Sequence, residues 1–416
     1  MPKYIAVIAS LDTKGEVVAV LKERIEHFGC LPILLDTSMM GEPGIAPDVT
    51  AAEMARAGGR DLNELRASTD TDWASSVMIA GGIVKLQELL SAGRLDGVLS
   101  VGGHSGTVVG TSMMKALPFG VPKFMVSSSA SMPYGPLYID TKDITLMHSV
   151  VDMAGVNERS HAILVRAAGG VCGMAKASDG PLKTTVHERP LIAVTEFKFA
   201  ERCVKWVLDG MAHHGYDAIV WHANGTGDRA MDELIEQGLY DAVIDVVPAG
   251  VSEFIFCGNR TAGPHRLEAA GRVGIPQVIA PSGFDMLSCG PLERREAGDQ
   301  LWASRKLAER AIFVPDAMRV QVRTTAAELV ELAGVLAEKL NAATGPVTMV
   351  FPTRGWSNIG SEGQPLHDPA TDAVLVDELR RVLKPEIRVV EVDTALNTPE
   401  FAAALLDELD ALMSAR

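Results

Sequence analysis

The chain has 416 residues, more than a single hydrophobic core of ordinary size contains, so we expect two domains. Its 47% hydrophobic and 22% charged residues are typical of a folded globular protein. A net charge of −15 argues against a nucleic-acid partner, because phosphate backbones are bound by an excess of lysine and arginine. Five scattered cysteines form no C-x-x-C pair, and neither a signal peptide nor a membrane span is expected, so we predict a cytoplasmic protein with no membrane partner.

The first part of the chain alternates short apolar runs with stretches of helical spacing. A strand at 4–9, a turn at Asp12–Glu16, a helix over about 16–28 and a strand at 31–35 would form one βαβ unit. Residues 41–72 are rich in glycine and acids and predict an irregular excursion. The remaining expected elements of this part are a helix at 73–92, a strand before Gly102, a helix at 105–116, a strand at 123–127 and a helix at 158–175.

A polar stretch bracketed by prolines, residues 179–190, predicts a linker between a lobe of residues 1–178 and a lobe of residues 191–416. The same alternation then resumes. Strands are expected at 191–196, 217–222, 241–247, 275–280, 318–323, 346–351 and 386–392, with helices between them and a long loop at 281–316. This pattern predicts the α/β class, with two Rossmann-like doubly wound lobes of mostly parallel strands and an interlobe cleft.

Ligands of open parallel sheets bind at the carboxyl ends of the strands, and four segments of the first lobe occupy such ends. They offer glycine N–H groups and small hydroxyls for phosphate, Lys14 for charge, and Asp36 for ribose hydroxyls. The predicted cofactor-binding residues are Asp12, Thr13, Lys14, Asp36, Gly102, Gly103, Ser105, Gly106, Thr107, Ser127, Ser128 and Ser129. Structural alternatives exist: the glycines also suit a strand-to-helix joint, and Asp12-Thr13 also suits a helix N-cap.

A second glycine turn, Gly225-Thr226-Gly227-Asp228-Arg229-Ala230, matches the G-x-G-x-x-A pattern of dinucleotide-binding proteins, with Asp245 on the next strand. An NAD(P)-dependent oxidoreductase is therefore a weaker alternative. Asp228 argues against it, because it would place an acid beside the phosphates. The chain has neither the G-x-x-x-x-G-K-[ST] motif of P-loop proteins nor the spacing of a zinc site, so no protein-held metal is predicted.

Four further side chains could carry out acid–base chemistry or bind a carboxylate: His104, His222, Asp285 and Arg354. They support an alternative function, an enzyme acting on a small carboxylated or phosphorylated metabolite in the interlobe cleft. A packed core histidine and a loop-capping aspartate would explain His222 and Asp285 equally well. The catalytic residues therefore stay unassigned.

Four motifs together resemble one known family. They are Asp12-Thr13-Lys14, Gly102-Gly103-x-x-Gly106-Thr107, Ser149–Asn157 and the segment from His222 to Met231. The chain is similar, over nearly its whole length, to the ATP-binding family typified by the amino-terminal region of the tomato tobamovirus-resistance protein, which has bacterial members of about this length. The plant proteins use this region to inhibit a viral replication protein.

The resemblance implies two Rossmann-like lobes, ATP bound in the first lobe, and a homodimer. Magnesium is expected only as a companion of a bound nucleotide. It supplies no established reaction for the bacterial members. The leading expectation is a nucleotide-binding protein whose small-molecule partner is ATP or a similar anion.

Overall fold

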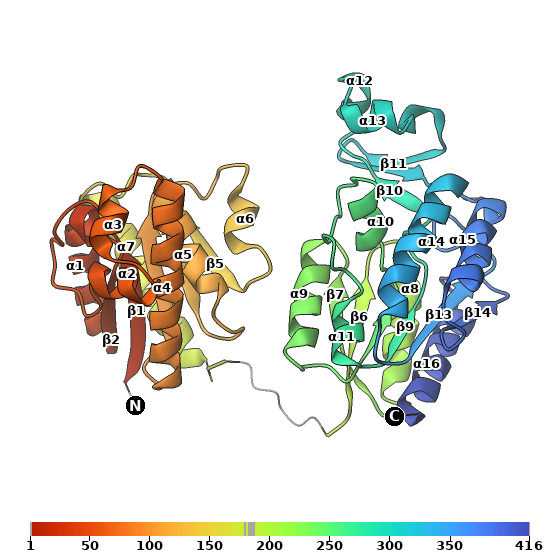
Figure 1. The fold of residues 1–416 in the computed structure, drawn as a ribbon, viewed down its shortest axis with the longest axis horizontal. Helices are drawn as coiled ribbons and strands as arrows, with labels where there is room; N and C mark the ends of the chain where they lie inside the picture. Colours follow the sequence, from red (N-terminus) through yellow and green to blue (C-terminus); the bar gives the residue numbers. More distant parts are fainter. Residues whose placement is uncertain (1, 179, 182–187, 416) are drawn as a thin grey trace. The chain divides into compact units, whose positions relative to one another are not determined.

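The computed structural model describes residues 2–178, 180–181 and 188–415. The chain divides into two compact units, Met1–Lys183 and Thr184–Arg416. Most of the expected linker, residues 179 and 182–187, lies outside the described residues. Each unit contains a parallel sheet covered by helices (Figure 1), which confirms the predicted α/β class. Among the described residues, no helix combines the length and the hydropathy needed to cross a bilayer.

The sheet of the first unit has five parallel strands in the order β2-β1-β3-β4-β5. Its strands are β1 (Lys3–Ala9), β2 (Cys30–Asp36), β3 (Gly97–Gly102), β4 (Lys123–Ser127) and β5 (Ile144–His148). In register, Ala9 pairs with Asp36, and Gly102 with Ser127. The polar segments that follow these strands therefore begin at one edge of the sheet.

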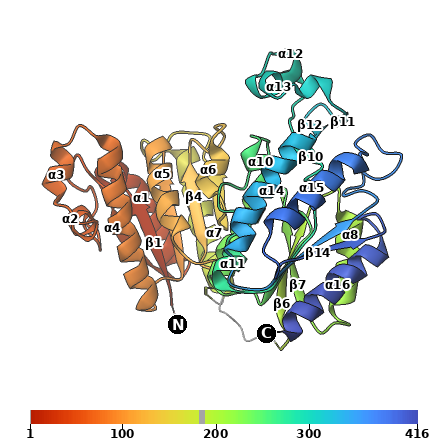
Figure 2. The same ribbon diagram turned by 45° about the vertical axis from the view of Figure 1, so that its right-hand side comes forward.

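Alternate residues of β1 face two separate cores, as the two-residue period of a strand requires. Ile5 and Val7 pack with α1 (Leu11–His27) and α7 (Glu158–Ala177) on one face. Ala6 and Ile8 pack on the other face, which is covered by α2 (Ala51–Ala57), α4 (Thr71–Ser91) and α5 (His104–Lys115). The short helices α3 (Leu62–Ala67) and α6 (Gly135–Ile139) complete the unit (Figure 2).

The second unit has a six-stranded parallel sheet in the order β14-β13-β9-β8-β6-β7. Its strands are β6 (Leu191–Glu196), β7 (Asp217–His222), β8 (Ala242–Asp245), β9 (Gln277–Ile279), β13 (Val347–Pro352) and β14 (Arg388–Val392). One face packs on α8 (Glu201–Met211) and α16 (Pro399–Ser414), and the other packs on α14 (Ala326–Asn341) and α15 (Pro369–Val382). Helices α9 (Thr226–Glu236) and α11 (Ala269–Val273) lie beside each other in the same unit.

A second, antiparallel sheet in this unit differs from expectation. It has the order β10-β12-β11, and it includes the residues predicted as a strand at 318–323. Its strands are β10 (Met286–Ser288), β11 (Ile312–Asp316) and β12 (Arg319–Arg323), and the short α10 (Gly250–Ile255), α12 (Glu293–Glu296) and α13 (Gln300–Ser304) lie near them (Figures 1 and 2). The expected loop at 281–316 is thus largely ordered structure.

Three further expectations for the first unit are wrong. The turn predicted at Asp12–Glu16 is the first turn of α1. The irregular stretch predicted at 41–72 contains α2, which begins with a capping box between Thr50 and Glu53, and α3. The strand β5 was not predicted, because its half-exposed edge position gives it no continuous apolar run.

Candidate functional site

A cavity of about 350 Å³ lies at the carboxyl ends of β1 and β3 in the first unit. It is lined by Ile8, Ala9, Ser10, Thr13, Lys14, Thr37, Ser100, Val101, Gly102, Gly103, His104, Ser105, Gly106, Val109 and Asp152. Six of the twelve predicted binding residues are among them: Thr13, Lys14, Gly102, Gly103, Ser105 and Gly106. The cavity volume falls within the range of small-molecule sites, about 300–1,000 Å³.

The N-terminus of α5 opens into this cavity without a cap. Gly103 is the N-cap residue and has no side chain to offer, and the first turn carries no acid. The first intrahelical bond runs from the Thr107 N–H to the Gly103 carbonyl, at 2.9 Å. The main-chain N–H groups of residues 104–106 therefore have no acceptor within the helix. A helix end of this kind attracts an anion through its N–H groups and its dipole.

The N-terminus of α1, by contrast, is closed by side chains that follow β2. The Leu11 N–H donates to Asp36 Oδ1 at 3.1 Å, and the Asp12 N–H donates to Ser38 Oγ at 2.9 Å. The Thr13 and Lys14 N–H groups both donate to the Ser10 carbonyl. The N–H groups of Leu11, Asp12 and Thr13, which have no i−4 acceptor in the helix, are thereby satisfied, so none of these three is left for a ligand.

Two of the three glycines in the first turn leave room that no protein atom fills. A Cβ on Gly103 would meet only Ser128 Oγ at 3.8 Å, and one on Gly106 only the Val101 carbonyl at 3.7 Å. Gly102 differs, since a Cβ there would lie 2.8 Å from the Gly106 Cα. Gly102 is thus required by the packing of the turn, whereas the space beside Gly103 and Gly106 is available to a ligand that approaches the backbone.

Lys14 and Asp152 bring opposite charges to the cavity. The Lys14 ammonium donates to the Met153 carbonyl at 2.7 Å, and Asp152 is exposed beside it. The Met153 carbonyl and Asp152 both belong to the Ser149–Asn157 segment, which follows β5. There the Val151 N–H donates to the Ser149 carbonyl at 2.6 Å, across Val150 at φ 63°. A β-branched residue in this backbone region is strained, and such strain gathers at functional sites.

The other six predicted residues support the loops instead of lining the cavity. The Asp12 carboxylate accepts from the Gly41 N–H at 3.0 Å, and Asp36 is buried under α1, so its predicted contact with a ribose is not supported. Thr107 Oγ1 lies 2.7 Å from Ser127 Oγ, and both residues are fully buried. The Ser129 N–H donates to Ser127 Oγ, and Ser128, the sixth of these residues, donates its N–H to the Gly102 carbonyl.

His104 stands at the rim of the cavity and is held by two tyrosines. Its Nδ1 lies 2.9 Å from the Tyr138 hydroxyl, and its ring meets Tyr134 edge to face. Burial raises the pKa of the Tyr138 hydroxyl, which keeps that group protonated and able to donate to the imidazole.

The second glycine turn is explained by packing within its own unit. A Cβ on Gly225 would lie 2.4 Å from the Thr261 carbonyl, and one on Gly227 would lie 2.1 Å from the His222 carbonyl. Asp228 accepts from the Gly225 N–H and from Arg266 Nε, and Arg266 also pairs with Asp245 at 2.5 Å. Because Asp245 is fully buried in this ion pair, it is not available to a ribose as the dinucleotide alternative requires.

The other candidate acid–base residues, His222, Asp285 and Arg354, all belong to the second unit. His222 stacks on Phe197, and Arg354 forms an exposed pair with Asp393. Asp285 is buried and accepts from Ser357 Oγ at 2.6 Å, and burial raises the pKa of its carboxyl. No described contact joins these three side chains into a catalytic group.

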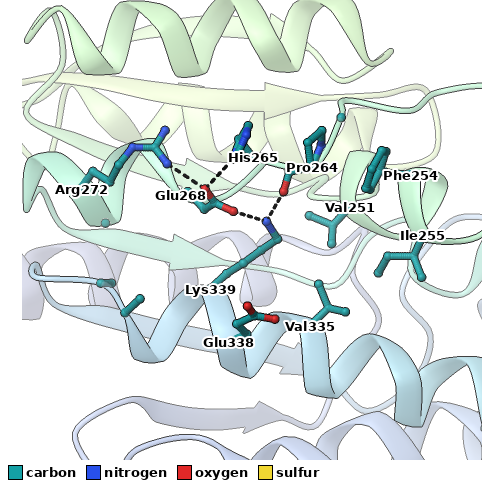
Figure 3. Close-up of a pocket in the computed structure, with 14 residues that line it drawn as sticks. Val251, Phe254, Ile255, Pro264, His265, Glu268, Arg272, Val335, Glu338 and Lys339 are labelled. Carbon is teal, nitrogen blue, oxygen red and sulfur yellow. Dashed lines mark hydrogen bonds and ion pairs between the residues drawn. The ribbon is translucent and has the colours of Figure 1, made fainter.

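A larger hollow of about 530 Å³ lies between α10, α11 and α14 (Figure 3). Its charged groups already neutralise one another, since Glu268 accepts from Lys339, His265 and Arg272. Burial alone would raise the pKa of Glu268, but the hydrogen bonds from Lys339 and His265 lower it. This hollow has little electrostatic attraction left for a ligand.

The predicted binding residues did not include Ser10, Thr37, Ser100 and Asp152, although Thr37 lies in Asp36–Ser38, one of the four strand-end segments expected to meet a ligand. Asp152 had a signal, because it lies in the Ser149–Asn157 motif. Because β5 was not predicted, no sequence pattern placed that motif at the carboxyl ends of the strands. The other three lie at the ends of predicted strands, where their small hydroxyls resemble those of ordinary turns.

The fold and the cavity define a two-unit α/β protein in which the uncapped N-terminus of α5 opens into a cavity at the strand ends of the first sheet. Residues 3–180 match the N-terminal domain of uncharacterised protein family UPF0261, and residues 189–413 match its C-terminal domain. The chain belongs to this family.

Relatives cover the chain from end to end. A UPF0261 protein of Clostridium tetani is 34% identical over 99% of this chain and 100% of its own length, and one of Mesorhizobium japonicum is 33% identical over 98% and 99%. The ToMV resistance protein Tm-1(GCR237) of Solanum lycopersicum is 30% identical over 76% of this chain and 41% of its own length. These matches confirm the family resemblance inferred from the motifs.

Among solved structures, a putative UDP-N-acetylglucosamine 2-epimerase from Listeria monocytogenes is 11% identical, with a TM-score of 0.24 over 67% of this chain and 79% of its own. A likeness this distant carries no argument about function.

Proposed function

We propose that the first unit binds a nucleotide, with ATP as the first ligand to test, and that its phosphates lie at the N-terminus of α5. The observation that carries this proposal is the uncapped helix end above Gly103 and Gly106, where three main-chain N–H groups and unfilled space face one cavity. A phosphate needs both features, because its oxygens accept several N–H groups only if the backbone can be approached closely.

The side chains around this helix end supply the remaining interactions. An ammonium group has three N–H donors, and Lys14 uses one of them on Met153, so two remain for phosphate oxygens. Ser105 adds a hydroxyl, whereas the Thr13 hydroxyl already donates to the Ser10 carbonyl at 3.3 Å. Asp152 would accept from a ribose hydroxyl or from water around a magnesium ion that arrives with the nucleotide.

Calorimetric titration of the full chain with Mg-ATP tests the proposal. Removing a charged hydrogen-bond donor costs about 1.5–3 kcal/mol, so Lys14→Ala is expected to weaken binding by about 10- to 100-fold. Lys22→Ala is the matched control, since Lys22 lies on the same helix and does not line the cavity. No heat of binding at millimolar Mg-ATP, or equal affinity in the Lys14→Ala and Lys22→Ala variants, would contradict the proposal.

A small phosphorylated metabolite is the second candidate ligand of this cavity, and His104 favours it. An imidazole fixed by Tyr138 at the rim could exchange a proton with a bound substrate. Titration with ATP, AMP and inorganic phosphate separates the two candidates. Nucleotide binding requires ATP to bind more tightly than phosphate, whereas equal affinity for both would favour the metabolite.

We also propose that the chain forms a homodimer, as its family resemblance implies. Sedimentation equilibrium of the full chain tests this directly. A mass that stays at 44.3 kDa over the accessible concentration range would contradict it.

A further inference from the structure

The second unit contains a cavity of about 250 Å³ that follows the carboxyl end of β6. The turn after that strand and the antiparallel sheet supply most of its lining. The lining includes Phe197, Lys198, Arg260, Phe313, Arg319 and Ile359. None of the predicted site residues lines this cavity, and the description of the matched family names no ligand.

Its central feature is the guanidinium of Arg260, a residue only 7% exposed. Nε donates to Glu253 Oε1 at 3.0 Å and to Ser288 Oγ at 2.8 Å. Nη2 makes an ion-pair contact of 2.9 Å with the same Oε1, but neither Nη1 nor Nη2 donates a hydrogen bond to any residue that the structure describes. The edge of the guanidinium formed by Nε and Nη2 is thus anchored on Glu253, whereas Nη1 and the second N–H of Nη2 have no acceptor among the described residues.

An unsatisfied buried donor is costly, so the free edge of Arg260 indicates a missing acceptor. Two terminal guanidinium nitrogens fit the two oxygens of a carboxylate or phosphate. The anchoring contacts hold the group in place for such a ligand, since Glu253 is fully buried and its Oε1 also accepts from the Ser288 N–H at 3.0 Å.

The lining of this cavity contains three cations, and two of them already have carboxylate partners outside the lining set. The lining residues, all in the described part of the chain, include the cations Lys198, Arg260 and Arg319 and no acid. Glu253 lies behind Arg260, and Asp316 pairs with Arg319 outside the lining set.

The rest of the cavity is apolar and aromatic. Phe197 stacks under the Arg260 guanidinium, 4.3 Å from ring centroid to Cζ, which fixes the plane of that group. Phe199 and Phe313 meet edge to face, and Ile359 packs in the same cluster. A ligand held at Arg260 would therefore extend a flat apolar body along Phe199, Phe313 and Ile359.

We propose that this cavity binds a small organic anion with a carboxylate or phosphate head and a flat apolar body. The head accepts hydrogen bonds from Nη1 and Nη2 of Arg260, and the body packs against Phe313 and its neighbours. This site is separate from the proposed nucleotide site, because every lining residue belongs to the second unit.

The first test uses the unmodified full chain and three probes of similar shape: benzoate, phenyl phosphate and the uncharged benzamide. Saturation-transfer NMR and calorimetry measure their affinities. Charged hydrogen bonds of about 1.5–3 kcal/mol predict that at least one of the two anions binds about 10- to 100-fold more tightly than benzamide. The tighter anion identifies the head group. Equal affinities, or no binding of either anion at millimolar concentration, would overturn the proposal.

The second test assigns the binding to this cavity. Arg260→Lys keeps the charge but loses the planar pair of terminal N–H donors. We expect this variant to bind the tighter of the two anions about tenfold or more weakly than the parent does. Phe313 is half-buried on strand β11, and Phe313→Ala leaves the Arg260–Glu253 pair intact. We expect this variant to reduce the affinity for the same probe by about fivefold or more.

Phe254→Ala is the matched control, because Phe254 is an exposed aromatic residue of the other hollow (Figure 3). Circular dichroism reports whether each variant folds, and Mg-ATP titration reports the first unit independently. Unchanged probe affinity in folded Arg260→Lys would overturn the assignment. If Arg260→Lys does not fold, unchanged affinity in Phe313→Ala overturns it instead.

Discussion

Arg266 shows how one buried side chain can explain a sequence motif that looks like a binding fingerprint. Its guanidinium lies among Asp228, Asp232 and Asp245, three carboxylates around one cation. The buried cluster therefore holds more negative than positive charge when every acid is ionised. Burial raises the pKa of Asp232 to about 7, and the neighbouring Asp245 and Asp228 add to this effect, while Arg266 opposes it.

The raised pKa of Asp232 predicts a pH-dependent stability. In the folded protein this pKa is about 7, against an ordinary aspartate value of 3.8, so protonation of Asp232 favours folding. Its contribution is fully present below the unfolded pKa and is lost as the pH rises through about 7. Asp232→Asn replaces the carboxylate with an uncharged amide, so the variant does not lose this stability as the pH rises. Urea unfolding should therefore show the variant more stable than the parent above pH 7, by up to about 4 kcal/mol, and equal to it near pH 4.

Asp209→Asn is the control for this measurement, since Asp209 is an exposed acid on α8. Its stability difference from the parent should stay small at every pH. A stability gain for Asp232→Asn that does not change between pH 4 and pH 8 would show that the raised pKa is not its cause.

Ser105 offers a residue-scale test that separates binding from folding. An acid in the first turn of a helix stabilises the helix by about 0.3–1 kcal/mol, so Ser105→Asp should keep or raise the melting temperature. The same charge repels a phosphate at the N-terminus of α5, and Mg-ATP affinity should fall by about tenfold or more. Ser105→Asn provides the neutral comparison and should retain most of the affinity. If Ser105→Asp binds Mg-ATP as well as Ser105→Asn does, the phosphates do not lie at this helix end.

At the scale of elements, the crossing of α2 and α4 depends on glycine. A Cβ on Gly81 would lie 1.8 Å from the Met54 carbonyl, and one on Gly58 would lie 2.2 Å from the Val77 carbonyl. The two helices therefore approach through their backbones, and they form part of the core over Ala6 and Ile8.

Gly81→Ala is expected to force these helices apart and to destabilise the first unit by about 1–3 kcal/mol. Gly173→Ala is the matched variant on α7, where the added methyl group meets no atom within 4 Å. It should stabilise the protein by about 0.5–1 kcal/mol, because glycine within a helix carries an entropic cost. Chemical denaturation measures both changes, and a Gly81→Ala variant as stable as the parent would show that the crossing can relax.

The elements that the sequence predicted well are those whose own residues determine them. The apolar run of β3 and the spacing of α5 are local features, and both elements lie within a few residues of the expected bounds. The start of α1 is different, because Asp36 and Ser38 cap it from across the sheet. Only the folded chain brings these partners together, so local patterns could not reveal that Asp12–Glu16 is helical.

The candidate site, too, was predictable only where local sequence patterns determine it. Lys14 and the glycine turn follow strands with strong apolar patterns, and the strand-end rule places them together. Asp36 has the same kind of position, yet its carboxylate points to the α1 N-terminus. Whether a strand-end acid faces a ligand or a helix depends on side-chain direction, which the sequence pattern does not contain.

At the scale of the whole molecule, each unit has its own cores. The clusters of the first unit join its sheet to α1, α7, α2 and α4, and those of the second unit join its sheet to α8, α16, α14 and α15. We therefore expect two transitions in scanning calorimetry. Saturating Mg-ATP should shift only one of them, by about 2.7 kcal/mol of stability at one hundred times the dissociation constant. An equal shift of both transitions would contradict separate folding of the units.

The segments that line the first cavity lie far apart in the sequence, so the ribosome synthesises them at different times. The glycine turn follows β3, but Asp152 and the carbonyl that holds Lys14 come from the segment beyond β5, the edge strand. A nascent chain that ends before this segment has the helix end for an anion but no anchored ammonium beside it. If the first unit binds a nucleotide as proposed, full ligand affinity should therefore appear only after the segment beyond β5 has been synthesised.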